Sequence, residues 1–229
     1  MLKHADILFE DNHLLIINKK PGEIVQGDKT GDIPLSDMAK GYLRKKYSKP
    51  GEVFLGVTHR LDRPVSGAVV FARTSKALTR INEMLQQRTM KKVYWAVVKE
   101  RPHPEAAKLV HYLRKDSEKN RTHVSLTPTR EGKRAELDYE LINHSDNYSL
   151  LEITLHTGRH HQIRAQLAKI GSPIRGDLKY GYQRPNPDKS IHLHARRLEF
   201  IHPVSKEMLV VTAPPPNETL WNYFAGIIG

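Results

Sequence analysis

Apolar residues occur along this chain in short runs separated by Gly, Pro and polar clusters. Runs of this length bounded by turn residues are typical of β-strands. The first two runs, on either side of Asp11-Asn12, predict two short strands or a hairpin, and the Lys19-Lys20-Pro21-Gly22 sequence that follows predicts a turn with solvated lysines. The pattern predicts strands at 7–9, 14–17, 53–57, 67–72, 93–98, 137–142, 149–156, 198–201 and 208–211.

Helical spacing of apolar residues marks a smaller number of segments. Leu78, Ile81 and Leu85 lie on one helical face, with Thr74 or Ser75 before them as N-cap candidates. Glycine after an apolar stripe is a common helix terminator, as at Gly171. Helices are predicted over 35–47 and 75–88, between Gly158 and residue 170, and over 220–224.

Asp62 lies in the loop between two of the predicted strands. It is flanked by Arg60 and Arg63, whose positive charges favour an ionised carboxylate that accepts hydrogen bonds. Taken on spacing alone, a local salt bridge is the simpler interpretation of this sequence.

The chain is strongly basic, with 37 Lys and Arg against 25 Asp and Glu, a net charge of +12. Such an excess favours polyanions, and nucleic acid is the commonest polyanion for a soluble protein. The chain has no Cys, no apolar run long enough to span a bilayer and no signal-peptide pattern at its N-terminus, so we expect a soluble cytoplasmic protein without a membrane partner.

The basic residues are spread over 40–49, 88–92, 114–121 and 159–175, which suits an extended basic face better than a disordered tail. Residues 100–134 predict strands joined by basic loops, of which 114–121 is the leading candidate for RNA contact. The alternative for these segments is a solvated surface.

Four motifs occur in a characteristic order. They are His59-Arg60-Leu61-Asp62 followed by Ser66-Gly67, the strand Lys92–Val98, Gly158-Arg159-His160-His161-Gln162-Ile163-Arg164, and Gly176-Asp177 with Tyr180-Gly181. Together they resemble the RluA-type family of RNA pseudouridine synthases over about 6–216, almost the whole chain. Val65 and His160 depart from this family pattern, in which threonine is commoner at both positions.

The resemblance implies a mixed α+β fold, in which a largely antiparallel sheet is flanked by helices and loops. It implies a single catalytic domain over 1–229, without the small RNA-binding domain that often precedes it in the family. We expect a monomer, because no interface pattern is evident.

The resemblance also implies the site. Asp62 would be the catalytic carboxylate, Tyr94 would lie against the target base as a proton acceptor, and Arg164 would pair with Asp62. Arg60 would fill the space that the displaced base leaves. The other residues implied in RNA binding and base displacement are His59, Arg63, Arg159, His161 and Gln162. Leu61 and Ile163 would form an apolar wall of the site.

Conversion of uridine to pseudouridine is an isomerisation without net redox change or phosphate transfer. The chain has neither a phosphate-cradling glycine motif nor a dinucleotide fingerprint, so no cofactor is expected. The substrate, ribosomal or transfer RNA, stays open. One alternative is an inactive RNA-binding protein of the same fold, and another is a metal enzyme using His160-His161 and His192-Leu193-His194.

Overall fold

The computed structural model describes residues 2–228, which divide into two compact units. The first comprises residues up to Met90 with Ala195–Pro216, and the second comprises Lys91–His194 with the segment from Asn217 onward. The chain passes between the units three times, after Met90, His194 and Pro216. The first two crossings lie at or near the start of a strand, and the third directly follows Pro214-Pro215-Pro216. The assignment of one catalytic domain to 1–229 stays a prediction.

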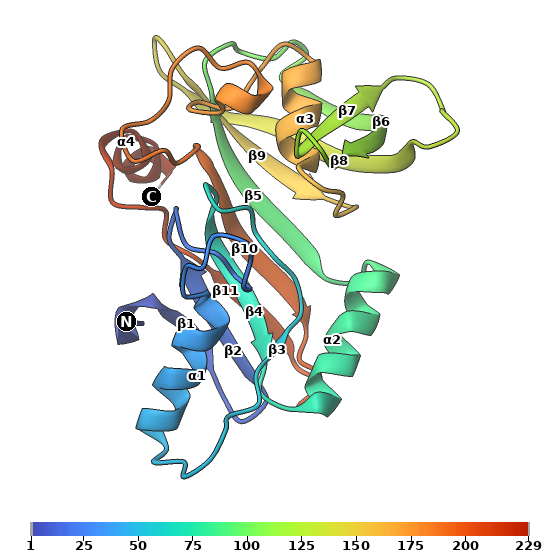
Figure 1. The fold of residues 1–229 in the computed structure, drawn as a ribbon. Helices are drawn as coiled ribbons and strands as arrows, with labels where there is room; N and C mark the ends of the chain where they lie inside the picture. The colour runs from blue at the N-terminus through green and yellow to red at the C-terminus, as the bar shows by residue number, and fades with distance from the viewer. Residues whose placement is uncertain (1, 229) are drawn as a thin grey trace. The chain divides into compact units, whose positions relative to one another are not determined.

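The first unit is built on a sheet in the order β1-β2-β4-β10. The pairs β1·β2, β2·β4, β3·β4 and β10·β11 are antiparallel. Helices α1 and α2 accompany this sheet (Figure 1). Its elements are the 3-10 helix His4–Asp6, β1 (Ile7–Glu10), β2 (Leu14–Lys19), α1 (Leu35–Lys46), β3 (Gly56–Val57), β4 (Ser66–Ala72), α2 (Ser75–Gln87), β10 (Leu193–Ile201, which enters this unit at Ala195) and β11 (Met208–Thr212).

Alternation along β2 and β4 builds the core of this unit. Leu14 and Ile16 share a buried cluster with Val70 of β4 and Ile81 of α2, as expected when every second strand residue points to one face. The predicted N-cap of α2 is confirmed, because the side chain of Thr74 accepts a hydrogen bond from the backbone N–H of Ala77.

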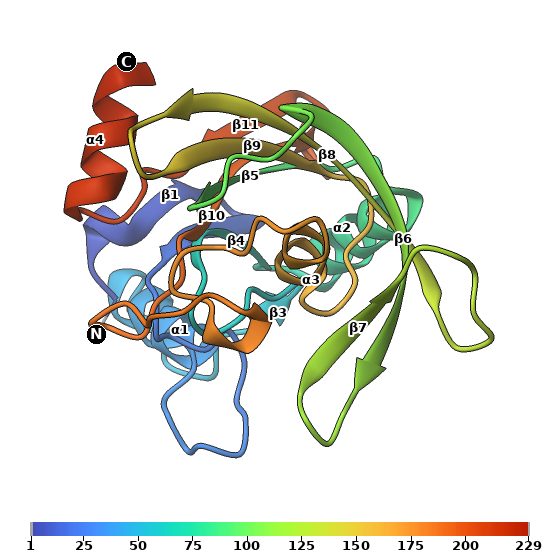
Figure 2. The ribbon, with the colours of Figure 1, turned by 90° about the horizontal axis from the view of Figure 1, so that it is seen from above.

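The second unit carries an antiparallel sheet in the order β5-β9-β8-β6-β7. The strands curve around α3, which packs against β6 and β7 (Figure 2). Its elements are β5 (Lys91–Val98), β6 (Ala106–Asp116), β7 (Arg121–Ser125), β8 (Lys133–His144), β9 (Ser149–Leu155), α3 (Gln162–Lys169), the 3-10 helix Leu178–Tyr180 and α4 (Thr219–Ile228).

Helix α4 packs on the face of β5 that Trp95 and Val97 occupy, and buries Trp221 and Phe224 there. The predicted helix over 220–224 is thereby confirmed as packed against the sheet, and α4 extends beyond it at both ends. One strand prediction changes in extent, because the run 53–57 forms strand only at Gly56–Val57. The basic loop predicted over 114–121 is shorter, because β6 extends to Asp116 and β7 begins at Arg121, which leaves a hairpin turn at 117–120.

Together the units confirm the predicted α+β class with a largely antiparallel sheet. Within residues 2–228, no helix combines the length and the apolar composition required to cross a bilayer.

Candidate active site

The loop that carries Asp62 joins β3 to β4 and is fastened along β4. The hydroxyl of Thr58 donates to the carbonyl oxygen of Val70 at 2.7 Å, and Nε2 of His59 accepts from the N–H of Val70 at 3.1 Å. The N–H of Val65 donates to the carbonyl oxygen of Asp62 at 3.0 Å, which closes a turn around the carboxylate-bearing residue. A half-buried carboxylate is thus held on a short, internally bonded loop.

A buried ammonium group supports this loop from β2. Lys19 has a relative exposure of 0%, and its Nζ donates to the carbonyl oxygens of Lys20 at 3.0 Å, Glu23 at 2.8 Å and Arg63 at 3.2 Å. The prediction of a solvated lysine is therefore wrong for Lys19, although it holds for the exposed Lys20. The sequence pattern missed this contact because the carbonyl oxygen of Arg63 belongs to a distant loop.

The environment of Lys19 changes its acidity. Burial lowers the pKa of its ammonium group to about 8, and the negative charges of Glu23 and Asp62 oppose that shift. Since Asp62 is among the groups that act on Lys19, the attraction is mutual.

Arg63 joins the Asp62 loop to the polar segment 27–33. Its guanidinium donates to Asp32 at 2.6 Å, to the hydroxyl of Thr30 at 2.7 Å and to Asp28 at 3.3 Å. Hydrogen bonds from Thr30, with a smaller effect of Arg63, hold the pKa of Asp28 below its usual range, whereas the Arg63 guanidinium is the main cause of the lowered pKa of Asp32. Arg60, in contrast, is exposed. Of the two arginines beside Asp62, Arg63 thus has a structural task, whereas Arg60 is open to solvent.

Arg164 and Asp177 form a buried bidentate ion pair in the second unit. Nε of Arg164 lies 2.7 Å from Oδ2 of Asp177, and Nη2 lies 2.9 Å from Oδ1. The side chains have relative exposures of 6% and 1%. In the sequence, Asp177 stands out only as part of the Gly176-Asp177 motif, and this ion pair gives it a role. The predicted pairing of Arg164 with Asp62 stays a prediction, because the two residues belong to different units.

Tyr180 extends this ion pair into a network. The guanidinium of Arg164 lies 5.2 Å from the centre of the Tyr180 ring, and the Tyr180 hydroxyl accepts from the N–H of Thr122 at 2.8 Å. The same hydroxyl lies 3.0 Å from Nδ1 of His161. Burial raises the pKa of Tyr180, so its hydroxyl keeps its proton at neutral pH. The Tyr180 side chain therefore contacts both His161, through its hydroxyl, and Arg164, through its ring.

The turn before α3 is fixed by Gln162. Its Oε1 accepts from the hydroxyl of Thr157 at 2.7 Å and from the N–H of Arg159 at 3.0 Å, and its Nε2 donates to the carbonyl oxygen of Glu136 at 3.1 Å. His161 has a positive φ of 49°, a conformation uncommon outside glycine. Gln162 is buried, whereas Arg159 is exposed and faces solvent as an RNA-binding residue would.

Three further predicted residues are buried. Tyr94 has a relative exposure of 7% on β5, Ile163 of 4% on α3 and Leu61 of 9% beside Asp62. Burial suits an apolar wall and a tyrosine held against a base, but does not test either role. Among residues 2–228, no three His, Asp or Glu side chains converge closely enough to hold a metal ion.

Comparison with known proteins identifies the family. The sequence model described as RNA pseudouridylate synthase matches residues 13–169. The chain belongs to this family. An uncharacterised RNA pseudouridine synthase of Bacillus subtilis is 33% identical over 219 residues, covering 92% of this chain and 68% of the relative. The ribosomal large subunit pseudouridine synthase D of Nitrosomonas europaea is 33% identical over 221 residues, covering 93% of this chain and 62% of the relative.

Solved structures confirm the pseudouridine synthase fold. The human RNA pseudouridylate synthase domain containing 4 aligns with a TM-score of 0.79 and 24% identity, covering 96% of this chain and 92% of that one. The human RNA pseudouridylate synthase domain containing 1 aligns with a TM-score of 0.69 and 20% identity, covering 100% of this chain and 98% of that one. The chain spans between 52% and 70% of the length of the curated relatives that it matches. The predicted RluA-type family and fold are confirmed.

Proposed function

We propose that this protein isomerises uridine to pseudouridine in structured RNA, and that Asp62 is the catalytic carboxylate. The observation that carries the proposal is the family match over residues 13–169, which includes the Asp62 loop. That loop is fastened to β4 and supported by the buried Lys19. The net charge of +12 suits a polyanionic substrate.

The reaction breaks the bond between ribose C1′ and uracil N1, turns the base and joins C1′ to C5. A carboxylate acts either by attack on C1′ or by removal of a sugar proton, and both routes require the ionised form. Lys19 supports the loop that carries this carboxylate by donating to the carbonyl oxygen of Arg63, the next residue. Tyr94 is the proposed acceptor of the C5 proton, and Arg164 the proposed partner of the Asp62 carboxylate.

The target uridine must leave its stack before it reacts, at a cost of a few kcal/mol when it is paired. We assign Arg60 to this step, because an exposed guanidinium can stack and hydrogen-bond in the space that the base leaves. Arg60→Ala should reduce turnover of a structured substrate more than that of a single-stranded one. An equal loss on both substrates would contradict the assignment.

We propose ribosomal RNA as the substrate, because several relatives that are 31–34% identical are named ribosomal large subunit pseudouridine synthases C or D. Transfer RNA is an alternative outcome of the experiment below. The remaining predictions, a monomer in the cytoplasm acting without a cofactor, accompany this proposal.

Pseudouridine mapping of total RNA tests the function and the carboxylate together. Cells with the gene intact, deleted, and restored with either the wild-type chain or Asp62→Asn are compared. One or a few sites should disappear on deletion, return with the wild-type gene and stay absent with Asp62→Asn. If no site changes and the purified protein modifies no RNA, the inactive RNA-binding protein becomes the better interpretation.

A further inference from the structure

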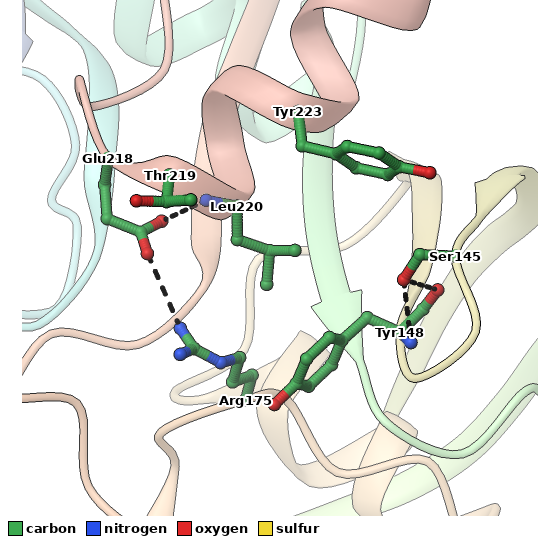
Figure 3. Close-up of a pocket in the computed structure, with 7 residues that line it drawn as sticks. All are labelled: Ser145, Tyr148, Arg175, Glu218, Thr219, Leu220 and Tyr223. Carbon is green, nitrogen blue, oxygen red and sulfur yellow. Dashed lines mark hydrogen bonds and ion pairs between the residues drawn. The ribbon is translucent and has the colours of Figure 1, made fainter.

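The second unit contains a pocket of about 330 Å³ between α4 and the loop that follows β8. This volume lies near the lower end of the range for small-ligand sites, roughly 300–1,000 Å³. Figure 3 shows the rings of Tyr148 and Tyr223 on two sides, with Leu220 pointing toward the space between them. Arg175 and Glu218 lie together at one end. None of these residues belongs to the predicted catalytic set.

The charged end of the pocket is built rigidly. The backbone of Arg175 donates to the carbonyl oxygen of Val97 at 2.9 Å and accepts from the N–H of His192 at 3.0 Å. Its guanidinium lies 5.4 Å from the centre of the Tyr148 ring, and its Nη1 lies 3.0 Å from Nε2 of His192. The planar cation is therefore held beside an aromatic wall before any ligand binds.

Glu218 is held from the other side. Its Oε2 accepts from the N–H groups of Leu220 and Trp221 at 3.2 and 3.3 Å, and lies 3.0 Å from Nε2 of the buried His192. Its Oε1 lies 3.9 Å from Nη1 of Arg175, too far for a hydrogen bond. A carboxylate acceptor and a guanidinium donor thus stand next to each other, each with capacity to bond a ligand.

We infer that this pocket binds an unpaired nucleobase of the RNA substrate, outside the target uridine. The Watson–Crick edge of every base places a hydrogen-bond donor beside an acceptor, which matches the adjacent Glu218 and Arg175. Unstacked RNA bases bind by stacking on aromatic rings and guanidinium planes, which Tyr148, Tyr223 and Arg175 provide. A base in a duplex has this edge occupied, so the pocket selects single-stranded RNA.

The surroundings of the pocket suit the phosphates of such a strand. Lys99 acts electrostatically on Tyr148, and Arg184 acts on the neighbouring Tyr182. Arg175 beside Tyr148 combines a cation with an aromatic ring, which is the combination that single-strand binding proteins use. The class of ligand rests on the proposed RNA-modifying function, whereas the pocket and its charges do not.

The test compares variants at Tyr223, whose exposure of 46% means that its loss leaves the core intact. Fluorescence anisotropy measures the affinity of the full chain for an unstructured RNA of about ten nucleotides, a length within the usual range for such sites. The same RNA annealed to its complement is measured in parallel. Tyr223→Ala should weaken single-strand binding roughly 5- to 100-fold, the usual effect of removing one base–aromatic stack, with duplex binding unchanged.

Two controls separate stacking from a general effect. Tyr223→Phe keeps the ring and should bind the single strand like the wild-type chain. Asn222→Ala removes an exposed side chain from the same helix outside the pocket and should also leave the affinity unchanged. Ultraviolet crosslinking of a 4-thiouridine RNA should join it to Tyr148 or Tyr223, as identified by mass spectrometry.

Unchanged single-strand affinity in Tyr223→Ala, or an equal loss for single strand and duplex, would overturn the inference. The first result would leave a peptide as the ligand class to test. The binding measurement needs no turnover, so it is independent of the catalytic test. If the wild-type chain modifies no uridine but Tyr223→Ala weakens single-strand binding, the proposed function is wrong and the inference about the pocket is supported. If the wild-type chain modifies uridine and Tyr223→Ala binds the single strand with unchanged affinity, the proposed function is supported and the inference about the pocket is wrong.

Discussion

The ammonium group of Lys19 donates a hydrogen bond to the carbonyl oxygen of Arg63, the residue directly after Asp62. The same carbonyl oxygen accepts from the N–H of Gly22 at 2.8 Å, where a φ of +87° suits glycine. The turn after β2 and the Asp62 loop are therefore joined at one atom. The position of the proposed catalytic carboxylate depends on a buried cation from another part of the chain.

Lys19→Met tests this dependence, because methionine has a similar length but no donor. Three carbonyl oxygens lose their common charged donor, although that of Arg63 keeps its bond from the N–H of Gly22, and a hydrogen bond to a charged group contributes about 1.5–3 kcal/mol. We expect the free energy of unfolding, measured in urea, to fall by about 2–4 kcal/mol and turnover to fall with it. Lys20→Met is the matched control. It loses only a half-exposed ion pair with Asp6, so a similar loss in both variants would refute the special role of Lys19.

Asp177→Asn tests the buried ion pair of the second unit. The substitution leaves the Arg164 guanidinium without its carboxylate at 6% exposure, and breaking a buried pair in this way costs about 3–5 kcal/mol. Arg101→Ala breaks an exposed pair with Glu105 and should cost at most about 1 kcal/mol. Urea unfolding measures both variants. Equal small losses in the free energy of unfolding would show that Asp177 does not balance the buried positive charge of Arg164.

His192 should make stability depend on pH in the acid range. Burial, together with the charge of Arg175, lowers its pKa to about 4, whereas an unfolded histidine titrates near its usual value of 6.5. Between these values the unfolded state binds more protons, so the contribution of His192 is present above about pH 6.5 and is lost as pH falls toward 4. The stability difference between wild type and His192→Gln should shrink over this window in urea unfolding series. A difference independent of pH would contradict the assignment.

Arg63→Gln should loosen the polar segment 27–33, because Arg63 bonds Asp28, Thr30 and Asp32 within it. Trypsin cleavage after Lys29 is expected to accelerate about 2- to 5-fold, the effect of losing exposed pairs worth about 0.2–1 kcal/mol each. Arg44→Gln, an exposed arginine on α1, serves as the control for charge loss. An unchanged cleavage rate would show that the segment is held by other contacts.

Local pattern determined most of the elements of this protein. Short apolar runs bounded by turn residues predicted β2, β4, β5, β8 and β9 to within a few residues, and helical spacing with a Thr74 cap predicted α2. These features depend on neighbours in sequence, which is why they can be read there. The Asp62 loop was predicted for the same reason, since strands on either side bound it.

Only the tertiary structure decided how polar side chains are paired. The solvated interpretation failed for Lys19 because its three acceptors include a carbonyl oxygen 44 residues away. The sequence placed Asp177 in a motif and Arg175 in a basic segment but did not indicate their partners, which come from other elements that pack against them. Alternation and spacing report which face of an element is apolar, but a hydrogen bond between distant segments exists only once the chain has folded. The sequence by itself thus determined the elements, the family and the basic character of this protein, and the tertiary structure decided which charges hold the Asp62 loop, Arg164 and the aromatic pocket in place.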